Sequence, residues 1–263
     1  MPEMSKMKKP DAKLVLLGDM NVGKTSLLHR YTERKFKDTI STVGGAFFLK
    51  QWGPYNMSIW DTAGREQFHG LGSMYCRGAA AVIFTYDVTN WQSLVELEER
   101  FLSLTDTANH DCIYAVVGNK ADLTDAKAQM SQDSGRVSED QTEYERDRTE
   151  PQLLSACPTP PATPASLSGV ILHKQVTHED AVALYGRILR YKGLEEKSSL
   201  PAEKMCFETS AKTGHNVDTL FETLFDLMLP SILRKRNENQ NSPTVDLEEC
   251  SVASSKQAKS ACC

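Results

Sequence analysis

The sequence predicts an α/β fold with a six-stranded, mostly parallel sheet, one antiparallel edge strand and helices on both faces. Apolar runs of strand length alternate with segments of helical periodicity, which is the pattern of parallel strands joined by helices. Residues 79–88 are almost continuously apolar, as expected for a strand buried on both faces. Two further runs, 47–51 and 56–60, flank a Gly53-Pro54 turn and predict an antiparallel hairpin at the sheet edge.

The stretch from Gly18 to Thr25 lies between a predicted strand, residues 13–17, and a predicted helix, residues 26–31. It reads G-x-x-x-x-G-K-T, and strand, loop and helix follow in the order of a phosphate-binding P-loop. Glycines allow the backbone to approach phosphate oxygens closely, so we expect Lys24 at the β- and γ-phosphates and Thr25 at Mg²⁺. A plain glycine turn is the alternative, which the complete motif disfavours. The other expected contacts of this loop are Gly18, Asp19, Asn21, Val22, Gly23 and Ser26.

A carboxylate and a hydroxyl further along the chain complete the expected phosphate site. Asp61 ends the predicted strand and precedes Thr62-Ala63-Gly64, where a P-loop hydrolase keeps a magnesium carboxylate and a backbone N–H that senses the γ-phosphate. Thr42 lies in a polar link, where its hydroxyl would join the Mg²⁺ shell once the third phosphate is bound. A strand-ending aspartate before a turn is the alternative for Asp61.

A third motif indicates which base is bound. Residues 113–118 predict a buried strand that delivers the motif Asn119 to Asp122 to the edge where open α/β sheets bind ligands. A carboxylate accepts two hydrogen bonds from guanine that adenine cannot supply, so we expect GTP rather than ATP. A polar loop is the alternative, but a second loop after the predicted strand 205–209 also suits base contact. The expected base contacts are Asn119, Lys120, Asp122, Ser210, Ala211 and Lys212.

The composition changes between these two loops. Residues 124–177 are rich in Ser, Thr, Asp, Glu and Gln, with clustered prolines and no apolar periodicity, and predict a disordered insertion. Helical periodicity is found at 93–104, resumes at 179–191 and recurs at 217–236, and we expect six strands and five helices in all. The expected organisation is an N-terminal extension at 1–12, a domain at 13–236 interrupted at about 124–177, and a flexible tail at 237–263.

The overall composition excludes several classes of protein. A chain of 263 residues with 40% hydrophobic content can bury a full core. Its net charge of −5 shows no basic excess, so nucleic acid is not an expected partner. Seven cysteines at irregular spacing, without a C-x-x-C pair, indicate a reducing compartment. Neither a signal peptide nor an apolar run of about 18 residues is found, so we expect a cytosol-facing protein.

In these motifs the chain resembles the small GTPases of the Ras superfamily, and among them the Rab family. The matching segments, in order, are Gly18 to Thr25, Thr42, Trp60 to Gly64, Tyr75 to Ala79, Asn119 to Asp122, Glu208 to Lys212 and Cys262-Cys263. The resemblance covers about residues 13–236 apart from the insertion. It implies a small G domain that binds GTP or GDP with Mg²⁺, acts as a monomer and recruits effectors in vesicle trafficking.

The resemblance also implies roles for individual side chains. Phe36 would stack on the guanine, Thr42 would be the magnesium ligand that senses the third phosphate, and an aromatic triad would be read by effectors. The triad is Phe47, Trp60 and Tyr75. These aromatic residues are equally explained as half-buried residues of a sheet, and the two explanations are compatible.

A membrane anchor is expected at the cysteine pair Cys262-Cys263, which is similar to a doubly prenylated Rab terminus. Two lipid chains anchor a protein stably where one binds only marginally. A pair of exposed thiols is the alternative. The resemblance further implies a Rab escort protein, GDI, an exchange factor, a GAP and effectors as partners. It places the protein on the cytoplasmic face of Golgi, endosome or phagosome membranes, with a cytosolic GDI-bound pool.

Several positions depart from the family pattern. Arg65 stands where Rab proteins keep the glutamine that orients the attacking water, and a guanidinium has donors only. Met20 and Asn21 replace a small Ser-Gly pair, and Gly45-Ala46 replaces a larger apolar residue followed by an acid. Tolerated drift is one explanation. With Arg65, Lys24, Thr42 and Gly64 as the catalytic candidates, we expect a slow GTPase, and the alternative is a hydrolysis-impaired GTP-bound scaffold. A nucleotide kinase is disfavoured, because no lid or acceptor site is evident.

Overall fold

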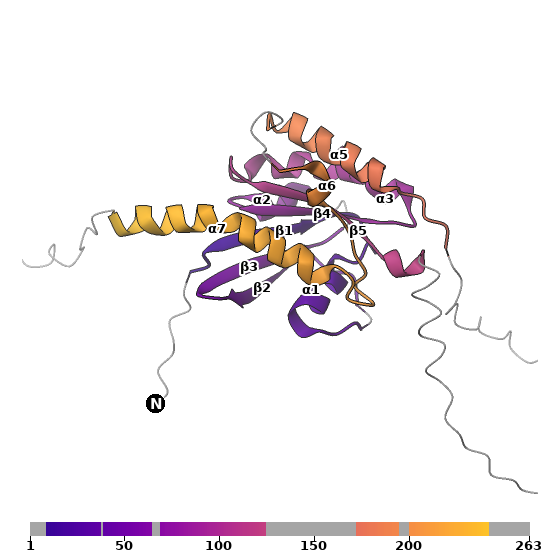
Figure 1. Cartoon of the computed structure of the whole chain (residues 1–263), viewed down its shortest axis with the longest axis horizontal. Coiled ribbons are helices and arrows are strands. Elements are labelled where there is room, and N and C mark those ends of the chain that lie inside the picture. Colours follow the sequence, from indigo (N-terminus) through magenta and orange to yellow (C-terminus); the bar gives the residue numbers. More distant parts are fainter. Residues whose placement is uncertain (1–8, 38, 65–68, 125–171, 195–199, 242–263) are drawn as a thin grey trace, which may run out of the picture. The chain divides into compact units, whose positions relative to one another are not determined.

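A computed structural model describes residues 9–37, 39–64, 69–124, 172–194 and 200–241 of the chain. Its centre is a six-stranded sheet with the order β2-β3-β1-β4-β5-β6 (Figure 1). Only β2 and β3 pair antiparallel, and the other neighbours are parallel, which confirms the predicted mixed sheet. The strands are β1 (Ala12–Leu17), β2 (Gly45–Trp52), β3 (Tyr55–Thr62), β4 (Ala81–Asp87), β5 (Ile113–Asn119) and β6 (Cys206–Glu208).

Burial along the strands follows their position in the sheet. Every residue of β4 is buried, as its apolar sequence predicts for a strand covered on both faces. The edge strand β2 instead alternates between exposed and partly buried residues. The register places Leu16 of β1 beside Asp61 of β3, and Asp87 of β4 beside Asn119 of β5. The polar residues that end these strands therefore gather at one edge of the sheet.

The helices that cover the sheet are more varied than the sequence predicts. The α-helices are α1 (Lys24–Glu33), α2 (His69–Cys76), α3 (Trp91–Glu96), α5 (His178–Tyr191), α6 (Ala202–Met205) and α7 (Val217–Asn241). The helix expected at 93–104 begins as α3 and continues as a π-helical turn, η2 (Leu97–Phe101), and a 3₁₀ segment, η3 (Ser103–Thr107). A second 3₁₀ turn, η4 (Ala121–Leu123), follows β5.

Three expectations for these elements are corrected. The described residues contain six α-helices where five were expected, because α6 has four residues and is too short to show helical periodicity. Since Met205 belongs to α6, the strand expected at 205–209 is only β6, with three residues. The last helix continues beyond the predicted residue 236 to Asn241.

Side-chain contacts join the helices in pairs. Tyr31 of α1 stacks on Phe221 of α7 with ring centroids 4.3 Å apart, and Arg187 of α5 donates to Glu98 of η2 over 2.7 Å. Figure 1 places α1 and the first turns of α7 on one side of the sheet, and α3 and α5 on the other. The chain divides into two units, Met1–Met228 and Leu229–Cys263. The sheet and the contacts above belong to the first unit, and the later turns of α7 belong to the second.

Most of the predicted insertion, residues 125–171, lies outside the described residues, as do most of the expected extension and tail. The described chain resumes at Leu172, whose backbone N–H donates to the Leu123 carbonyl over 2.9 Å. Val176 is fully buried and donates its N–H to the Val88 carbonyl. The residues from 172 to 177, expected to be part of the insertion, are therefore attached to the fold through backbone hydrogen bonds and through the buried Val176. Along the described residues, no helix is long and apolar enough to cross a membrane.

Candidate nucleotide-binding site

The loop that joins β1 to α1 is shaped by glycine. Gly23 has a φ of 95°, a left-handed conformation that side chains rarely adopt. A Cβ atom at this position would lie 2.3 Å from Nδ2 of Asn119. Asn119 Nδ2 donates to the Val22 carbonyl over 2.8 Å, so the loop is fastened to the end of β5. The glycine of the motif is thus required both by the turn and by this close approach.

Lys24 opens α1 and lies almost completely inside the loop, with 5% of its surface exposed. Its Nζ donates to the carbonyls of Gly18 and Asp19 over 2.7 and 2.8 Å. Burial lowers the pKa of Lys24 to about 8, and the charges of Asp61 and Asp19 oppose this shift. The ammonium therefore lies where the loop backbone would surround a phosphate.

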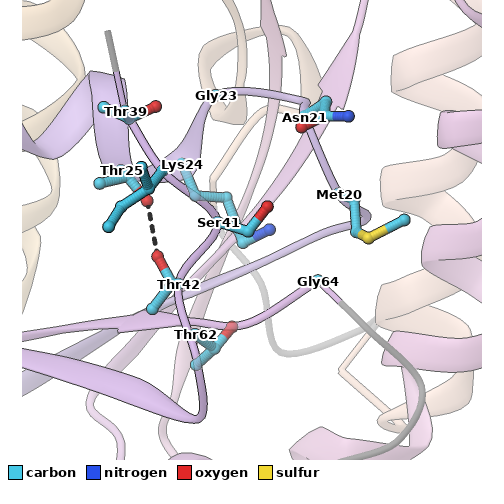
Figure 2. Close-up of a pocket in the computed structure, with 11 residues that line it drawn as sticks. Met20, Asn21, Gly23, Lys24, Thr25, Thr39, Ser41, Thr42, Thr62 and Gly64 are labelled. Atoms are coloured by element: carbon cyan, nitrogen blue, oxygen red, sulfur yellow. Dashed lines mark hydrogen bonds between the residues drawn. The ribbon is translucent and has the colours of Figure 1, made fainter. Parts of the chain in front are cut away.

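Three oxygen-bearing side chains meet beside this lysine. Thr25 Oγ1 donates to Asp61 Oδ2 over 2.6 Å, Thr42 Oγ1 donates to the same oxygen over 2.9 Å, and the two hydroxyls are 3.0 Å apart. Figure 2 shows the Thr25 and Thr42 hydroxyls facing each other below Lys24. Thr25 belongs to α1, Thr42 to the link before β2 and Asp61 to the end of β3. Segments far apart in the sequence therefore build one cluster of oxygen atoms.

The donor set of this cluster fits Mg²⁺. Asp61 is fully buried, and its Oδ1 receives no hydrogen bond from the described residues. A buried carboxylate oxygen without a partner is costly unless another group, such as a cation, satisfies it. Hydroxyl and carboxylate oxygens are the ligands that Mg²⁺ prefers, together with phosphate oxygens and water. Among the described residues, no three His, Cys, Asp or Glu side chains cluster as metal ligands, so a cation here would depend on the hydroxyls and on a bound phosphate.

A pocket lies over this cluster, between the loop and the link that carries Thr42 (Figure 2). Met20, Asn21, Gly23 and Gly64 are among the residues that line it. Met20 is 41% exposed and forms part of its wall, so the bulk expected near the γ-phosphate is present. Arg65 follows Gly64 in the chain but lies outside the described residues.

A second pocket adjoins the first and is lined by five of the six residues predicted to contact the base, all but Ser210. Asn119 Oδ1 accepts from the Ala211 N–H over 3.1 Å, and Asp122 Oδ1 accepts from Ser210 Oγ over 2.6 Å. The two predicted base loops are thereby held together. Phe36 lines the same pocket and is half exposed, as an aromatic ring that stacks on a base requires. Asn21, Gly23 and Thr39 line both pockets, which form one crevice.

Residues that the sequence analysis did not single out support this crevice. Lys120 Nζ pairs with Asp87 Oδ2 over 2.7 Å, and Arg30 Nε donates to the Ala211 carbonyl over 2.7 Å. Arg100 Nη1 lies 2.8 Å from Glu96 and 3.4 Å from Asp19 of the loop. Asp87 could have been found as a strand-ending acid at the ligand edge. Arg30 carried no such signal, because 181 residues separate it from Ala211.

The three aromatic side chains of the predicted effector triad meet from β2, β3 and α2. The Phe47 and Trp60 rings are 5.2 Å apart, and the Trp60 and Tyr75 rings are 5.7 Å apart. Gly45 explains how Tyr75 reaches this position, since a Cβ at residue 45 would lie 2.7 Å from the Tyr75 ring. The unusual glycine is therefore matched to a close contact. The role of the triad stays a prediction.

Comparison with known proteins assigns the chain to a family. The model of the Ras family matches residues 13–146. Ras-related protein Rab-20 of Homo sapiens is 59% identical over 98% of this chain and 100% of its own length.

The chain belongs to the Ras family.

The predicted membership of the Rab family is confirmed by its Rab-20 and Rab5 relatives. Rab-20 of Mus musculus is 58% identical over 98% of this chain and all of its own length, and Rab5 of Nicotiana tabacum is 42% identical over 47% of this chain and 64% of its own length. The combination of Gly45-Ala46, Arg65-Glu66-Gln67 and the long insertion predicts a resemblance to Rab-20, and the two Rab-20 relatives confirm it. As a Rab GTPase, the protein binds GTP and GDP, hydrolyses GTP and switches effectors in vesicle trafficking at endomembranes.

Gly45→Ala is predicted to move Tyr75 away from Trp60 and to destabilise the GDP-bound protein by about 1 kcal/mol, because the added methyl overlaps the ring. Unfolding by denaturant measures this loss. Gly186→Ala is the control, since a Cβ there meets no atom within 4 Å and lies in helix α5, so it should be neutral or stabilising. In a protein that already carries Tyr75→Ala, the change Gly45→Ala should cost little stability, because the ring that the methyl overlaps is gone. If the two losses of stability were strictly additive, the proposed contact would be contradicted.

Proposed function

We propose that this Rab GTPase binds Mg²⁺-GTP in the crevice described above. The convergence of Thr25, Thr42 and Asp61 carries the proposal, because it supplies hydroxyl and carboxylate oxygens and leaves Asp61 Oδ1 without a partner among the described residues. These three residues would hold the ion, which would neutralise charge on the β- and γ-phosphates. Thr42 comes from the link before β2, so its contact would form in the GTP state and be lost after hydrolysis.

The remaining residues of the loop have complementary roles in this proposal. Lys24 would place its ammonium at the β- and γ-phosphates, in exchange for the two carbonyls that it contacts. The backbone N–H groups of the loop and of Gly64 would face the phosphate oxygens. Lys24 would make this exchange within the loop that already surrounds it, which would limit the free-energy cost of organising the site.

Guanine selectivity is proposed to depend on Asp122. Ser210 Oγ donates to its Oδ1, which orients the carboxylate toward the pocket that Phe36 and Lys212 also line. The carboxylate would accept from the N1–H and the amino group of guanine, and it would remain unpaired with adenine. Asn119 would keep this loop at a fixed distance from the phosphate loop.

Asp122→Asn is predicted to weaken GDP binding about a thousandfold and to favour xanthosine diphosphate, because two charge-assisted hydrogen bonds worth about 4 kcal/mol are lost or reversed. The new amide oxygen can still accept from Ser210, so the loop should keep its shape. Competition binding with the two nucleotides measures the change. Asp226→Asn, at an exposed site on α7, is the matched control and should leave the preference for guanine intact.

We further propose that intrinsic hydrolysis is slow. Arg65 replaces the water-orienting glutamine, and a guanidinium cannot accept a hydrogen bond from the attacking water. An opposite effect is conceivable, in which Arg65 stabilises charge on the γ-phosphate as an internal arginine finger. Such a finger acts only on an aligned nucleophile, and Met20 narrows the pocket where both would have to fit. The wall formed by Met20 also favours the second candidate function, a hydrolysis-impaired, GTP-bound scaffold that is controlled by its supply and its extraction from the membrane.

Arg65→Gln is predicted to raise the single-turnover hydrolysis rate about tenfold, toward roughly 10⁻⁴ s⁻¹, because a restored water contact would lower the barrier by about 1.4 kcal/mol. Arg65→Ala separates the two explanations. It should match the wild type if the arginine is passive. A wild type that hydrolyses GTP faster than both variants would show that Arg65 assists the reaction.

Membrane attachment is proposed to require the cysteine pair Cys262-Cys263, which lies outside the described residues, on the cytoplasmic face of Golgi, endosome or phagosome membranes. This proposal is supported by the membership of the chain in the Rab family and by the presence of two adjacent cysteines. We also propose a monomeric G domain and a cytosolic pool bound to GDI after prenylation by way of the Rab escort protein.

Replacing both cysteines with serine is predicted to shift the protein from the membrane fraction to the cytosol in a cell lysate, because no second lipid chain would remain. GDP affinity should not change. A single replacement should give an intermediate distribution. Persistent membrane sedimentation of the double variant would place the anchor elsewhere in the chain.

A further inference from the structure

The residues from Leu172 to Val176 form a strap that contacts the segments next to the base end of the crevice. They are the first described residues after residue 124, and each end of the strap is fastened to a different part of the fold. The Leu172 N–H donates to the Leu123 carbonyl over 2.9 Å. Gln175 and Val176 both donate their N–H groups to the Val88 carbonyl, over 2.9 and 3.2 Å. The strap is therefore an extended segment with fixed ends.

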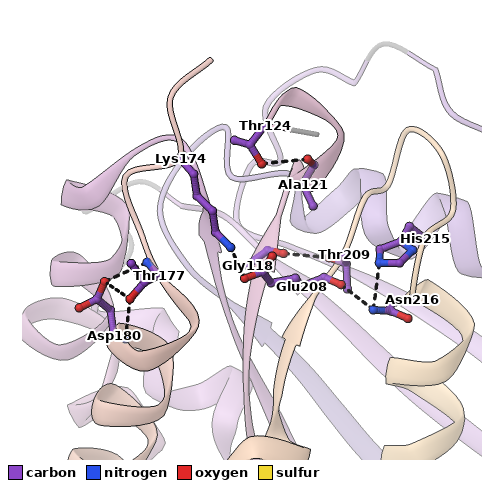
Figure 3. Close-up of polar contacts among 10 residues, drawn as sticks. All are labelled: Gly118, Ala121, Thr124, Lys174, Thr177, Asp180, Glu208, Thr209, His215 and Asn216. Atoms are coloured by element: carbon purple, nitrogen blue, oxygen red, sulfur yellow. Dashed lines mark hydrogen bonds and ion pairs between the residues drawn. The ribbon is translucent and has the colours of Figure 1, made fainter. Parts of the chain in front are cut away.

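Lys174 joins the middle of this strap to the strand that leads into the second base loop. Its Nζ forms an ion pair with Oε1 of Glu208, the last residue of β6, as Figure 3 shows. The two side chains are 35% and 29% exposed, so the pair is only partly screened by water. The strap thus contacts Leu123, directly after the first base loop, and Glu208, shortly before the second. It links the segments that flank the two base loops.

Both contacts lie next to residues that are expected to touch guanine. Leu123 follows Asp122 directly, and Glu208 stands two positions before Ser210. The loops are also joined to each other, because the Ala121 N–H donates to the Thr209 carbonyl over 3.0 Å. A shift of β6 away from the strap would therefore change the position of Ser210 relative to Asp122.

The far end of the strap is held independently of Lys174. Thr177 caps α5, where its Oγ1 accepts from the Asp180 N–H over 3.2 Å and its own N–H donates to Asp180 Oδ2 over 2.9 Å (Figure 3). Val176 is fully buried, and Gln175 Oε1 accepts from the Trp91 N–H. Removing the Lys174 amine would break the bridge to β6 while these contacts keep the strap in place.

We propose that the strap is a clasp on the base pocket and that Lys174 is a positioning residue which, through Glu208, slows nucleotide dissociation. The proposal rests on the guanine site proposed above. The clasp restrains the two loops in the arrangement that grips the base, and it does not touch the phosphate end of the crevice. It therefore affects how long the nucleotide stays bound, and not how fast bound GTP is hydrolysed.

The test is the dissociation rate of a fluorescent GDP analogue from the full chain in the presence of excess GDP. Lys174→Ala should raise this rate about three- to fivefold, since the ion pair is partly exposed. Lys174→Arg should restore most of the wild-type rate, because the positive charge and reach are kept. Single-turnover hydrolysis of bound GTP should be the same in all three proteins.

Arg187→Ala is the matched control. It breaks the ion pair with Glu98, which has side chains 42% and 41% exposed and lies between α5 and η2, away from both base loops. If this control accelerates dissociation as much as Lys174→Ala does, the effect is general destabilisation and the proposal is wrong. Unchanged dissociation in Lys174→Ala, or equal acceleration in Lys174→Arg, also overturns it.

Two deletions extend the test to the segment that precedes the strap. Because Leu123 and Leu172 are hydrogen-bonded, replacing residues 126–171 with a short flexible linker should leave the clasp and the dissociation rate unchanged. A deletion that continues through residue 174 should accelerate dissociation. Equal dissociation rates in the two deletion variants would contradict the clasp. If Asp122→Asn still shifted the preference from guanine to xanthine nucleotides, the proposed guanine site would stand even so.

Discussion

The buried amide of Asn119 holds together the three segments on which the crevice depends. Its Nδ2 donates to Val22 of the phosphate loop, and its Oδ1 accepts from the Ala211 N–H of the second base loop. Asn119 itself ends β5, and only 1% of its surface is exposed. A buried amide that lost either partner would leave a polar group unsatisfied, which costs about 1–3 kcal/mol. One side chain thus sets the distance between the phosphate end and the base end of the site.

Charge is arranged around this frame so that the site is incomplete without its ligand. Asp61 is a buried carboxylate with one oxygen engaged by two hydroxyls and the other without a partner among the described residues. Lys24 is a buried ammonium that donates to two carbonyls, and burial lowers its pKa. Both groups would gain from a magnesium phosphate, since each would meet an opposite charge there. The same physics would couple binding to the proposed switching of Thr42.

The structure explains some of the departures from the family pattern and leaves others without a structural reason. Gly45 has a clear structural reason, because Tyr75 occupies the space that a side chain would need. Met20 forms part of the wall of the pocket beside Lys24, and the structure offers no reason for it. The residues from Leu172 to Val176 add a third feature, because their backbone is hydrogen-bonded to Leu123 and Val88.

The sequence alone predicted the mixed sheet with its antiparallel hairpin and the residues that the structure brings together at the crevice. It could do so because a P-loop, a strand-ending Asp61 and the motif at Asn119 are local patterns whose spacing fixes them to the carboxyl ends of parallel strands. Only the tertiary structure showed the order of the strands and the contacts of Arg30 with the Ala211 carbonyl, of Asp87 with Lys120 and of Lys174 with Glu208. It also showed that Leu172, Gln175 and Val176 are hydrogen-bonded to the fold and that Val176 is buried, although the polar composition of residues 172–177 predicts disorder. These features depend on partners far away in the chain, and no local periodicity or composition encodes which distant backbone group will be near enough to satisfy a donor.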